Sequence, residues 1–360
     1  MFMSLGIATL VILFVTLLPF WRNPHWMVRG MEFPRLQFAV MAAVLLLIQL
    51  VFLDPATLST WALVVPTLLC LAWQVWRVAP CSRFWPREVQ TATESSPDRS
   101  IGIMIANVLT SNRNAEPLLA LARQRTPDIL VTLESDQWWQ DQLDVLQAEM
   151  PHTMKCPLDN LYGMHVYSRL PLDDNEIEFL IENDVPSMHA NARLRTGEGV
   201  RIHFLHPSPP SPTENTESSE RDAELLIIAR SVDDSDGPVI VAGDFNDVTW
   251  SATTRLFRKI SGLLDPRVGR GMFNTFHAGY PFMRWPLDHI FHSQHFTLRS
   301  MERLPPIGSD HFPLLAILSC APEEGAAQEG LAADGADHYR ARSTIAEEGA
   351  NQGDVPRPGS

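Results

Sequence analysis

Three long apolar stretches at the start of the chain constrain its fold more than any other feature. They run from Phe2 to Phe20, from Leu36 to Leu53 and from Trp61 to Trp76. A helix needs about 18 or more apolar residues to cross a bilayer; the first two stretches meet this length and the third is at the short end. A cleaved signal peptide is the alternative for the first, but it has no basic n-region and further apolar segments follow it. We therefore predict a membrane anchor of three transmembrane helices over residues 1–80.

The distribution of arginine predicts the orientation of this anchor. No arginine lies in residues 54–60, between the second and third stretches, whereas the other two flanks are basic. The residues concerned are Arg22, Arg29 and Arg35 in the first connection, and Arg77, Arg83 and Arg87 at the end of the third stretch and beyond it. The positive-inside rule makes the basic side cytoplasmic. We predict a multi-pass protein of the inner or plasma membrane, with the lipid bilayer as a partner and the following domain in the cytoplasm.

The rest of the chain is acidic, which bears on the substrate. The formal net charge is −14 overall, +2 for residues 1–80 and −5 for residues 321–360, so residues 81–320 carry −11. A protein that holds nucleic acid tightly usually presents Lys and Arg to the phosphates. The acidic balance therefore disfavours tight, processive nucleic-acid binding, although it leaves room for a local basic groove. Four cysteines provide no disulfide framework.

Beyond the anchor, composition divides the chain into three parts. Residues 81–99 contain a polar run that predicts a linker. Residues 100–320 alternate short β-type runs with helical patterns, which predicts an α/β sandwich. Residues 321–360 have too few apolar side chains to form a core, and we predict that this tail is disordered.

Polar side chains recur at the ends of the predicted strands. The strands that matter are Ile101–Val108, Asp128–Leu133, Val200–Leu205, Pro238–Ala242, Leu287–His292 and Phe312–Leu318. The polar residues are Asn107, Glu134, His206, the run Gly243-Asp244-Phe245-Asn246, Asp288, and the run Gly308-Ser309-Asp310-His311. Carboxylates, amides and imidazoles gathered in this way are typical of a scaffold that surrounds one metal ion.

This set resembles the endonuclease/exonuclease/phosphatase family of metal-dependent phosphoesterases, which includes nucleases, inositol phosphate phosphatases and sphingomyelinases. The resemblance covers roughly residues 100 to 318. It implies a DNase I-like fold, a two-layer β-sandwich flanked by helices, here preceded by the three transmembrane helices. Leu133 stands where the family often has Gln before the glutamate, which weakens the expected contacts around that side chain.

The resemblance also implies how a metal is held. Glu134 matches the main metal ligand, Asn107 matches an asparagine beside the metal and the phosphate, and Asp310 lies near the metal. Mg²⁺ prefers hard oxygen ligands and only one or two carboxylates. We expect Mg²⁺ or Mn²⁺ as the cofactor.

Five further residues are expected to carry the chemistry. Asp244 can orient or deprotonate the attacking water, and Asn246 can donate to a phosphoryl oxygen. By resemblance, His206 contacts the phosphate or assists the leaving oxygen, with a purely structural histidine as the alternative. His311 is expected to act on the phosphate as a hydrogen-bond donor or general acid–base, with Asp288 fixing its tautomer.

Substrate contacts are less defined. Tyr162 matches a region where some nuclease members have a phosphate-contacting tyrosine, but packing is an equal alternative. The segment Pro207–Glu220, rich in Pro, Ser, Thr and Glu, is predicted to be a mobile loop beside the site. The expected function is hydrolysis of a phosphoester of unknown class by a membrane-anchored enzyme. The alternatives are an endonuclease or exonuclease acting on DNA or RNA and, less favoured, an inactive scaffold of the same fold.

Overall fold

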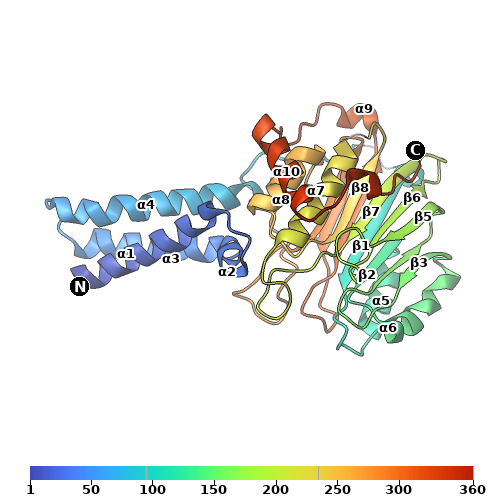
Figure 1. The fold of residues 1–360 in the computed structure, drawn as a ribbon, viewed down its shortest axis with the longest axis horizontal. Helices are drawn as coiled ribbons and strands as arrows, with labels where there is room; N and C mark the ends of the chain where they lie inside the picture. Colours follow the sequence, from blue (N-terminus) through green and yellow to red (C-terminus); the bar gives the residue numbers. More distant parts are fainter. Residues whose placement is uncertain (94–95, 234, 360) are drawn as a thin grey trace.

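The computed structural model of the chain describes residues 1–93, 96–233 and 235–359. A helical arm formed by the N-terminal residues projects from a body built on two β-sheets (Figure 1). The arm consists of α1 (Phe2–Leu17), α3 (Arg35–Phe52) and α4 (Leu58–Val78), with the short helix α2 (Trp26–Arg29) where the arm meets the body. The first connection and the end of α4 both lie at the body end of the arm (Figure 1). The two basic flanks therefore share one end of the arm.

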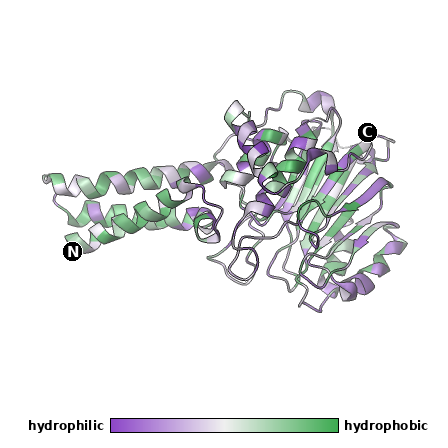
Figure 2. Ribbon diagram, viewed as in Figure 1, coloured by the Kyte–Doolittle hydropathy of each residue, from purple (hydrophilic) through white to green (hydrophobic). Residues whose placement is uncertain are grey.

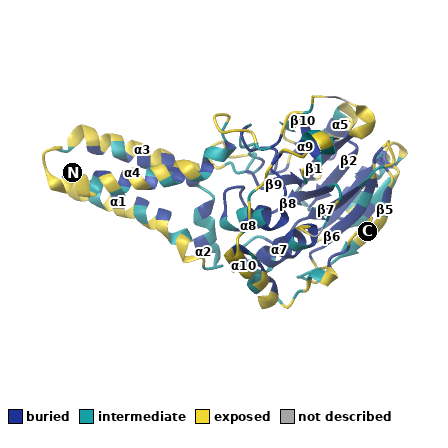
Figure 3. Ribbon diagram, turned by 90° about the horizontal axis from the view of Figure 1, so that it is seen from above, coloured by how far each residue is buried: buried dark blue, intermediate teal, exposed yellow. Residues whose placement is uncertain are grey.

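The surface of the arm is mostly apolar. The spans Phe2–Trp21, Arg35–Phe52 and Leu58–Cys81 are long and apolar enough to cross a membrane, and only 17%, 28% and 28% of their most apolar windows are buried. The same helices are mainly apolar in Figure 2 and mainly exposed in Figure 3. Exposed apolar side chains over the length of a helical bundle are stable in lipid and unfavourable in water. The third span is longer than the sequence pattern predicts, because α4 starts at Leu58 and continues through Arg77.

Polar side chains hold the three helices together inside the arm. The buried Gln49 of α3 donates through Nε2 to Thr9 Oγ1 of α1 at 2.9 Å and to Thr67 Oγ1 of α4 at 3.1 Å. Gln74 of α4 donates to Thr16 Oγ1 of α1 at 3.0 Å. Hydrogen bonds of this kind associate helices in lipid, where apolar contact alone gives little preference for protein over lipid.

Two sheets pack face to face in the body. The first has the order β10 (Phe296–Arg303), β11 (Leu314–Cys320), β1 (Ser100–Asn107), β2 (Ile129–Leu133), β4 (Met164–Ser168) and β3 (His152–Cys156). The second has the order β5 (Leu172–Glu178), β6 (Ser187–Arg193), β7 (Gly199–Leu205), β8 (Val239–Asp244) and β9 (Asp288–His292). Side chains such as Ile103, Val131, Phe204 and Ile240 fill the space between the sheets. This arrangement confirms the predicted two-layer β-sandwich.

Helices cover the outer face of each sheet. The first sheet packs on α5 (Glu116–Arg125) and α6 (Gln137–Leu143) through a cluster that includes Met104, Leu118 and Trp139. The second sheet packs on α7 (Ser219–Asp233) and α8 (Ala252–Ser261) through Val241, Phe257 and neighbouring residues. With their inner and outer faces covered, the central strands are buried along their whole length. Apolar runs without a polar alternation are the expected sequence pattern for such strands.

The segment 81–99 does not behave as a free linker in its described part. Cys81 and Val89 are buried, and Glu88 pairs with Arg258 of α8. The first connection is also docked on the body, where Trp250 Nε1 donates to the carbonyl of Glu32 at 2.8 Å and Arg29 pairs with Asp222 of α7 at 2.8 Å. The arm and the body are therefore joined by buried contacts rather than by a flexible tether.

The tail corrects the prediction of disorder. It forms α9 (Pro322–Gly325) and α10 (Gly335–Glu347), and α10 packs against α7 with Ala341 and Ile345 buried. A capping box between Asp334 and Asp337 starts α10 by satisfying backbone N–H groups. Average composition missed this helix because only one narrow face of it is apolar, and that face completes the cover over the second sheet.

Replacing Ile345 by Ala is expected to lower the free energy of unfolding by about 2–4 kcal/mol, because removing a buried aliphatic side chain leaves a cavity. The exposed Arg342 lies on the same helix, so Arg342→Ala should change stability by less than about 0.5 kcal/mol. Thermal unfolding of the detergent-solubilised chain measures both. Equal midpoints for the two variants would contradict the docked position of α10.

Candidate active site

The polar residues meet because of how the strands are paired. β1 runs parallel to β2, and β7 runs parallel to β8, so the carboxyl ends within each pair share one edge of their sheet. β9 is antiparallel to β8 and begins at Asp288, directly opposite Asp244. Side chains from both sheets therefore converge at one end of the sandwich.

An imidazole links two buried carboxylates at the centre of the site. His311 Nδ1 lies 2.8 Å from Asp288 Oδ2, and His311 Nε2 lies 3.5 Å from Asp244 Oδ2. Burial opposes a positive charge on His311, but Asp244 and Asp288 outweigh it and raise the pKa of His311 to about 10. Burial also raises the pKa of Asp244 above its usual range, with the positive charge of His311 opposing that change. Asp288, His311 and Asp244 therefore form one buried unit in which the proton of His311 is held between two carboxylates.

A second unit connects the first sheet to the same centre. Asn107 Nδ2 lies 2.8 Å from Glu134 Oε1 and 3.3 Å from Asp244 Oδ2, so it donates toward both carboxylates. Burial raises the pKa of Glu134 to about 7, although the hydrogen bond from Asn107 opposes the shift. Glu134 has a left-handed backbone with φ of 56°, and Thr110 Oγ1 donates to its carbonyl at 2.8 Å. An unfavourable backbone of this kind is maintained by its surroundings and is common at functional sites.

The turn after β8 needs its glycine. A Cβ on Gly243, whose φ is 148°, would lie 1.9 Å from the carbonyl oxygen of Leu205. This close approach brings the chain to Asp244, whose Oδ1 accepts from the backbone N–H of Asn246 at 2.9 Å. Asn246 Nδ2 donates to the carbonyl of Pro207 at 3.0 Å, leaving the second amide hydrogen for another acceptor.

His206 and Tyr162 form one wall. His206 is buried, burial lowers its pKa to about 4, and its Nδ1 has no hydrogen-bond partner among the described residues. The ring of Tyr162 lies 5.4 Å from the ring of His206, and its hydroxyl donates to Glu214. His206 is therefore neutral near pH 7, with an unused nitrogen at the site.

A cavity of about 270 Å³ opens onto this arrangement. Glu134, Tyr162, His206, Asn246, Asp310 and His311 line it, and Asn107, Asp244 and Asp288 contact the lining side chains of Glu134 and His311. The structure thus brings the residues predicted from the sequence to one place. Their individual roles remain predictions.

Several lining residues were not predicted. Phe33 comes from the first connection of the arm, and Leu161, Glu214 and Phe276 come from loops of the body. The segment Pro207–Glu220 does lie beside the site, as predicted, because Pro209 also lines the cavity. No local pattern around Phe33 indicated its position, because only the docking of arm on body takes it there.

The donor set fits a divalent cation. Glu134 and Asp310 place carboxylates at the cavity, and Asn107 lies 2.8 Å from Glu134. Ligand atoms of Asp244, Asp288 and His311 also lie within 4.8 Å of one another, but His311 holds its proton there and leaves the oxygen atoms as the donors. The buried Oδ1 of Asp288 has no hydrogen-bond partner among the described residues. Hard oxygen donors with a vacant lone pair match the preference of Mg²⁺ and Mn²⁺.

A two-sheet sandwich flanked by helices, with carboxylates, an amide and imidazoles gathered at its strand ends, defines a DNase I-like fold. The chain belongs to the endonuclease/exonuclease/phosphatase family, whose model matches residues 104–311. The resemblance found in the sequence is thereby confirmed. Members of this family are hydrolases that act on phosphoester bonds.

Individual relatives are distant. A UPF0294 protein of Vibrio cholerae is 29% identical over 133 residues, which cover 36% of this chain and 44% of that protein. A UPF0294 protein of Vibrio parahaemolyticus is 28% identical over 129 residues, covering 36% and 43%. The matches therefore span less than half the length of these curated relatives.

Solved structures share the fold at low identity. An endonuclease/exonuclease/phosphatase from Beutenbergia cavernae has a TM-score of 0.51 at 16% identity, covering 62% of this chain and 72% of that chain. D. rerio TDP2, complexed with a single-strand DNA product, has a TM-score of 0.51 at 16% identity, covering 61% and 99%. The human Nocturnin catalytic domain, with bound sulfate, has a TM-score of 0.50 at 18% identity, covering 61% and 94%.

Proposed function

We propose that the chain is a metal-dependent phosphoester hydrolase anchored in a membrane by α1, α3 and α4. The observation that carries this proposal is the hydrogen-bonded unit of Asp288, His311 and Asp244 at the metal-compatible cavity. The basic flanks at the body end of the arm favour a cytoplasmic body under the positive-inside rule.

The side chains divide the reaction among them. Glu134 and Asp310, with Asn107 beside them, would hold a divalent cation, which would supply positive charge to neutralise the phosphoryl oxygens. Asp244 orients a water for in-line attack and accepts its proton, because burial favours the protonated carboxyl.

His311, held in one tautomer by Asp288, donates to a phosphoryl oxygen, and Asn246 offers a second donor. His206, which lines the cavity, is placed to contact the phosphate or assist the leaving oxygen.

The first test is hydrolysis of bis(p-nitrophenyl) phosphate by the full chain in detergent, with Mg²⁺, Mn²⁺ or a chelator. We expect turnover that the chelator abolishes and added metal restores, because the described cavity lining has no Lys or Arg to neutralise the phosphoryl oxygens. Turnover indifferent to the chelator would contradict a metal-dependent hydrolase. So would the absence of both turnover and metal-induced stabilisation.

The position of the cavity favours a substrate carried by the membrane. Phe33, two residues before α3, lines the cavity, and its ring packs edge-on against the ring of Trp285 with 5.8 Å between the ring centroids. Gln37, in the first turn of α3, donates to the carbonyl of Phe282 at 2.8 Å. The loop that carries Phe282 exposes apolar side chains: Phe282 is 89% exposed, and Tyr280 and Met283 are more than half exposed. Aromatic side chains at this level of a membrane protein are favoured in the bilayer interface.

The charge at the cavity also favours a substrate other than nucleic acid. Its described lining includes Glu134, Glu214 and Asp310 but no Lys or Arg. A nuclease is expected to present basic side chains along the nucleic-acid backbone. We therefore propose a phosphoester presented at the bilayer surface as the substrate, and we place nucleic acid second.

Replacing Phe282 by Ser tests the substrate side. We expect hydrolysis of a phospholipid in vesicles to fall roughly tenfold, because burying a phenylalanine contributes about 1.5–3 kcal/mol. Hydrolysis of bis(p-nitrophenyl) phosphate should be unchanged, since Phe282 does not line the cavity. Phe179→Ser, at an exposed phenylalanine outside the cavity, is the matched control. Equal losses on the two substrates would contradict interfacial substrate capture.

A further inference from the structure

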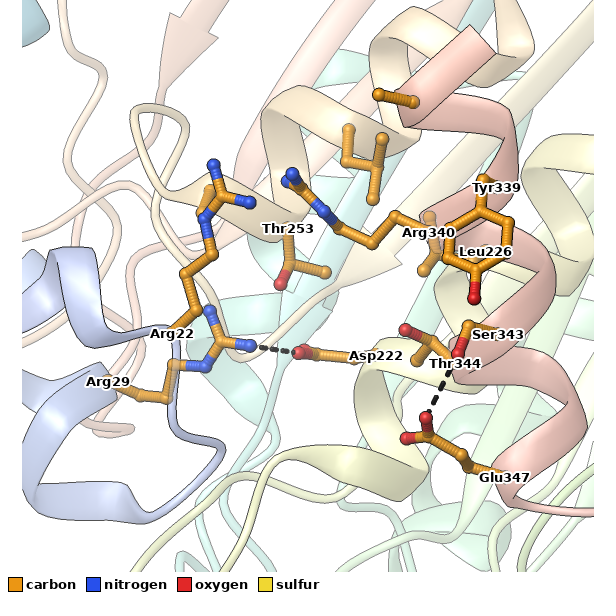
Figure 4. Close-up of a pocket in the computed structure, with 13 residues that line it drawn as sticks. Arg22, Arg29, Asp222, Leu226, Thr253, Tyr339, Arg340, Ser343, Thr344 and Glu347 are labelled. Atoms are coloured by element: carbon orange, nitrogen blue, oxygen red, sulfur yellow. Dashed lines mark hydrogen bonds and ion pairs between the residues drawn. The ribbon is translucent and has the colours of Figure 1, made fainter.

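A second cavity, of about 440 Å³, lies where the arm meets the body (Figure 4). Its walls come from the first connection of the arm and from α7, α8 and α10. It shares no lining residue with the catalytic cavity. It is therefore a separate feature of the molecule.

Two arginines enter this cavity from different segments. Arg22 extends from the first connection and Arg340 from α10, both beside Thr253 (Figure 4). Within the described part of the chain, neither forms an ion pair. Burial, followed by the positive charge of Arg22, lowers the pKa of Arg340, and the nearby charges of Asp337 and Asp334 only partly oppose this. Arg22 and Arg340 therefore bring two positive charges, neither in an ion pair with a described residue, to the wall of one hollow.

The acids of this region are already engaged. Asp222 accepts from Arg29 at 2.8 Å, Glu347 accepts from Ser343 Oγ at 3.0 Å, and Asp337 accepts from Lys259 at 2.6 Å. An adjoining hollow shares Arg22 and Arg340 and adds Arg77 and Arg255 to its lining. Neither of these added arginines pairs with a described carboxylate. Four arginines without acidic partners thus gather at one place in a chain whose net charge is −14.

The arginines also sit at a defined depth. Arg22 directly follows the span that ends at Trp21, and Arg77 belongs to the last turn of α4 beside the exposed Trp76. This is the end of the apolar arm that adjoins the body (Figure 1). If the arm spans a bilayer, lipid head groups lie at this level.

We infer that this cavity binds the phosphate of an anionic lipid head group between Arg22 and Arg340. Guanidinium groups form paired hydrogen bonds with phosphate oxygens. Because Arg22 belongs to the arm and Arg340 to the tail, the bound phosphate joins the two and sets the orientation of the body on the membrane. The site is independent of the catalytic proposal.

The test compares the full chain in vesicles of phosphatidylcholine alone and of phosphatidylcholine mixed with phosphatidylglycerol. We expect the anionic lipid to raise the midpoint of thermal unfolding by a few degrees, since a ligand that binds only the folded state stabilises it. A parallel experiment adds inorganic phosphate to the chain in neutral detergent. If inorganic phosphate raises the unfolding midpoint and the anionic lipid does not, the phosphate site is supported but its ligand is a free phosphate.

Two variants and one control separate this site from general surface charge. Arg340→Gln and Arg22→Gln should each abolish the lipid-induced rise while keeping the midpoint measured in phosphatidylcholine alone. Arg342→Gln removes the same charge from an exposed position of α10 outside the cavity and should keep the rise. An absence of any rise, or an equal loss in all three variants, would overturn the inference.

Discussion

The variant Asp244→Asn is expected to lose roughly a thousandfold in metal-dependent turnover, because a positioned general base contributes about 10²–10⁴-fold. The substitution keeps the volume of the side chain and the acceptor for the Asn246 N–H, which is 2.9 Å from Oδ1. It removes the atom that accepts the proton of the attacking water. Initial rates with bis(p-nitrophenyl) phosphate measure the effect, and Asp98→Asn, at an exposed acid outside the cavity, is the matched control.

The same variant makes a pH prediction. Asp244 and Asp288 together raise the pKa of His311 to about 10 against the effect of burial. Removing the charge of Asp244 takes away one of these two contributions to the pKa of His311, so His311 loses its proton at a lower pH. The residual activity of Asp244→Asn should therefore decline at a lower pH than the wild-type activity does. Unchanged turnover in this variant would contradict the role assigned to Asp244.

The variant Glu134→Gln is expected to weaken metal binding by at least the roughly 10–100-fold that partners outside the ligand set cost. Gln keeps an oxygen that can accept from Asn107, so the local fold should survive. The upward shift of the unfolding midpoint on adding Mn²⁺ measures binding without relying on turnover. Glu116→Gln, at an exposed glutamate of α5, should keep the full shift.

Glu134 also predicts how metal binding depends on pH. Burial raises the pKa of this carboxyl to about 7, so below pH 7 a proton competes with the cation and the apparent affinity falls. The affinity of the wild-type chain should therefore rise as the pH increases through 7, and this part of the dependence should disappear in Glu134→Gln. A wild-type metal shift retained in Glu134→Gln at all pH values would exclude Glu134 as a ligand.

Much of the site could be predicted because its parts are local. Glu134 follows a buried apolar strand, and Asp244 follows a glycine that only a tight turn needs. Such signals lie within a few neighbouring residues, so they can be recognised before the fold is known. The three apolar spans are equally local, because length and hydropathy alone decide whether a helix is stable in lipid.

Other features depend on contacts between distant segments. The prediction of a disordered tail was wrong because α10 is stabilised by burying Ile345 against α7, a partner more than a hundred residues earlier. The predicted linker likewise contains Val89, which packs in the core between the sheets. Average composition over a segment carries no information about the surface that the segment covers.

The sequence by itself determined the family, the sandwich and the set of polar side chains that meet at the cavity, since each is recorded in short patterns at strand ends. Only the tertiary structure decided that Asp244 and Asp288 share His311, and that Phe33 of the arm lines the same cavity as Glu134. It also decided that Arg22 and Arg340 meet at the base of the arm. The physical reason is that distances between residues far apart in the chain are set by strand register and by the docking of one packed body on another, which no local pattern encodes.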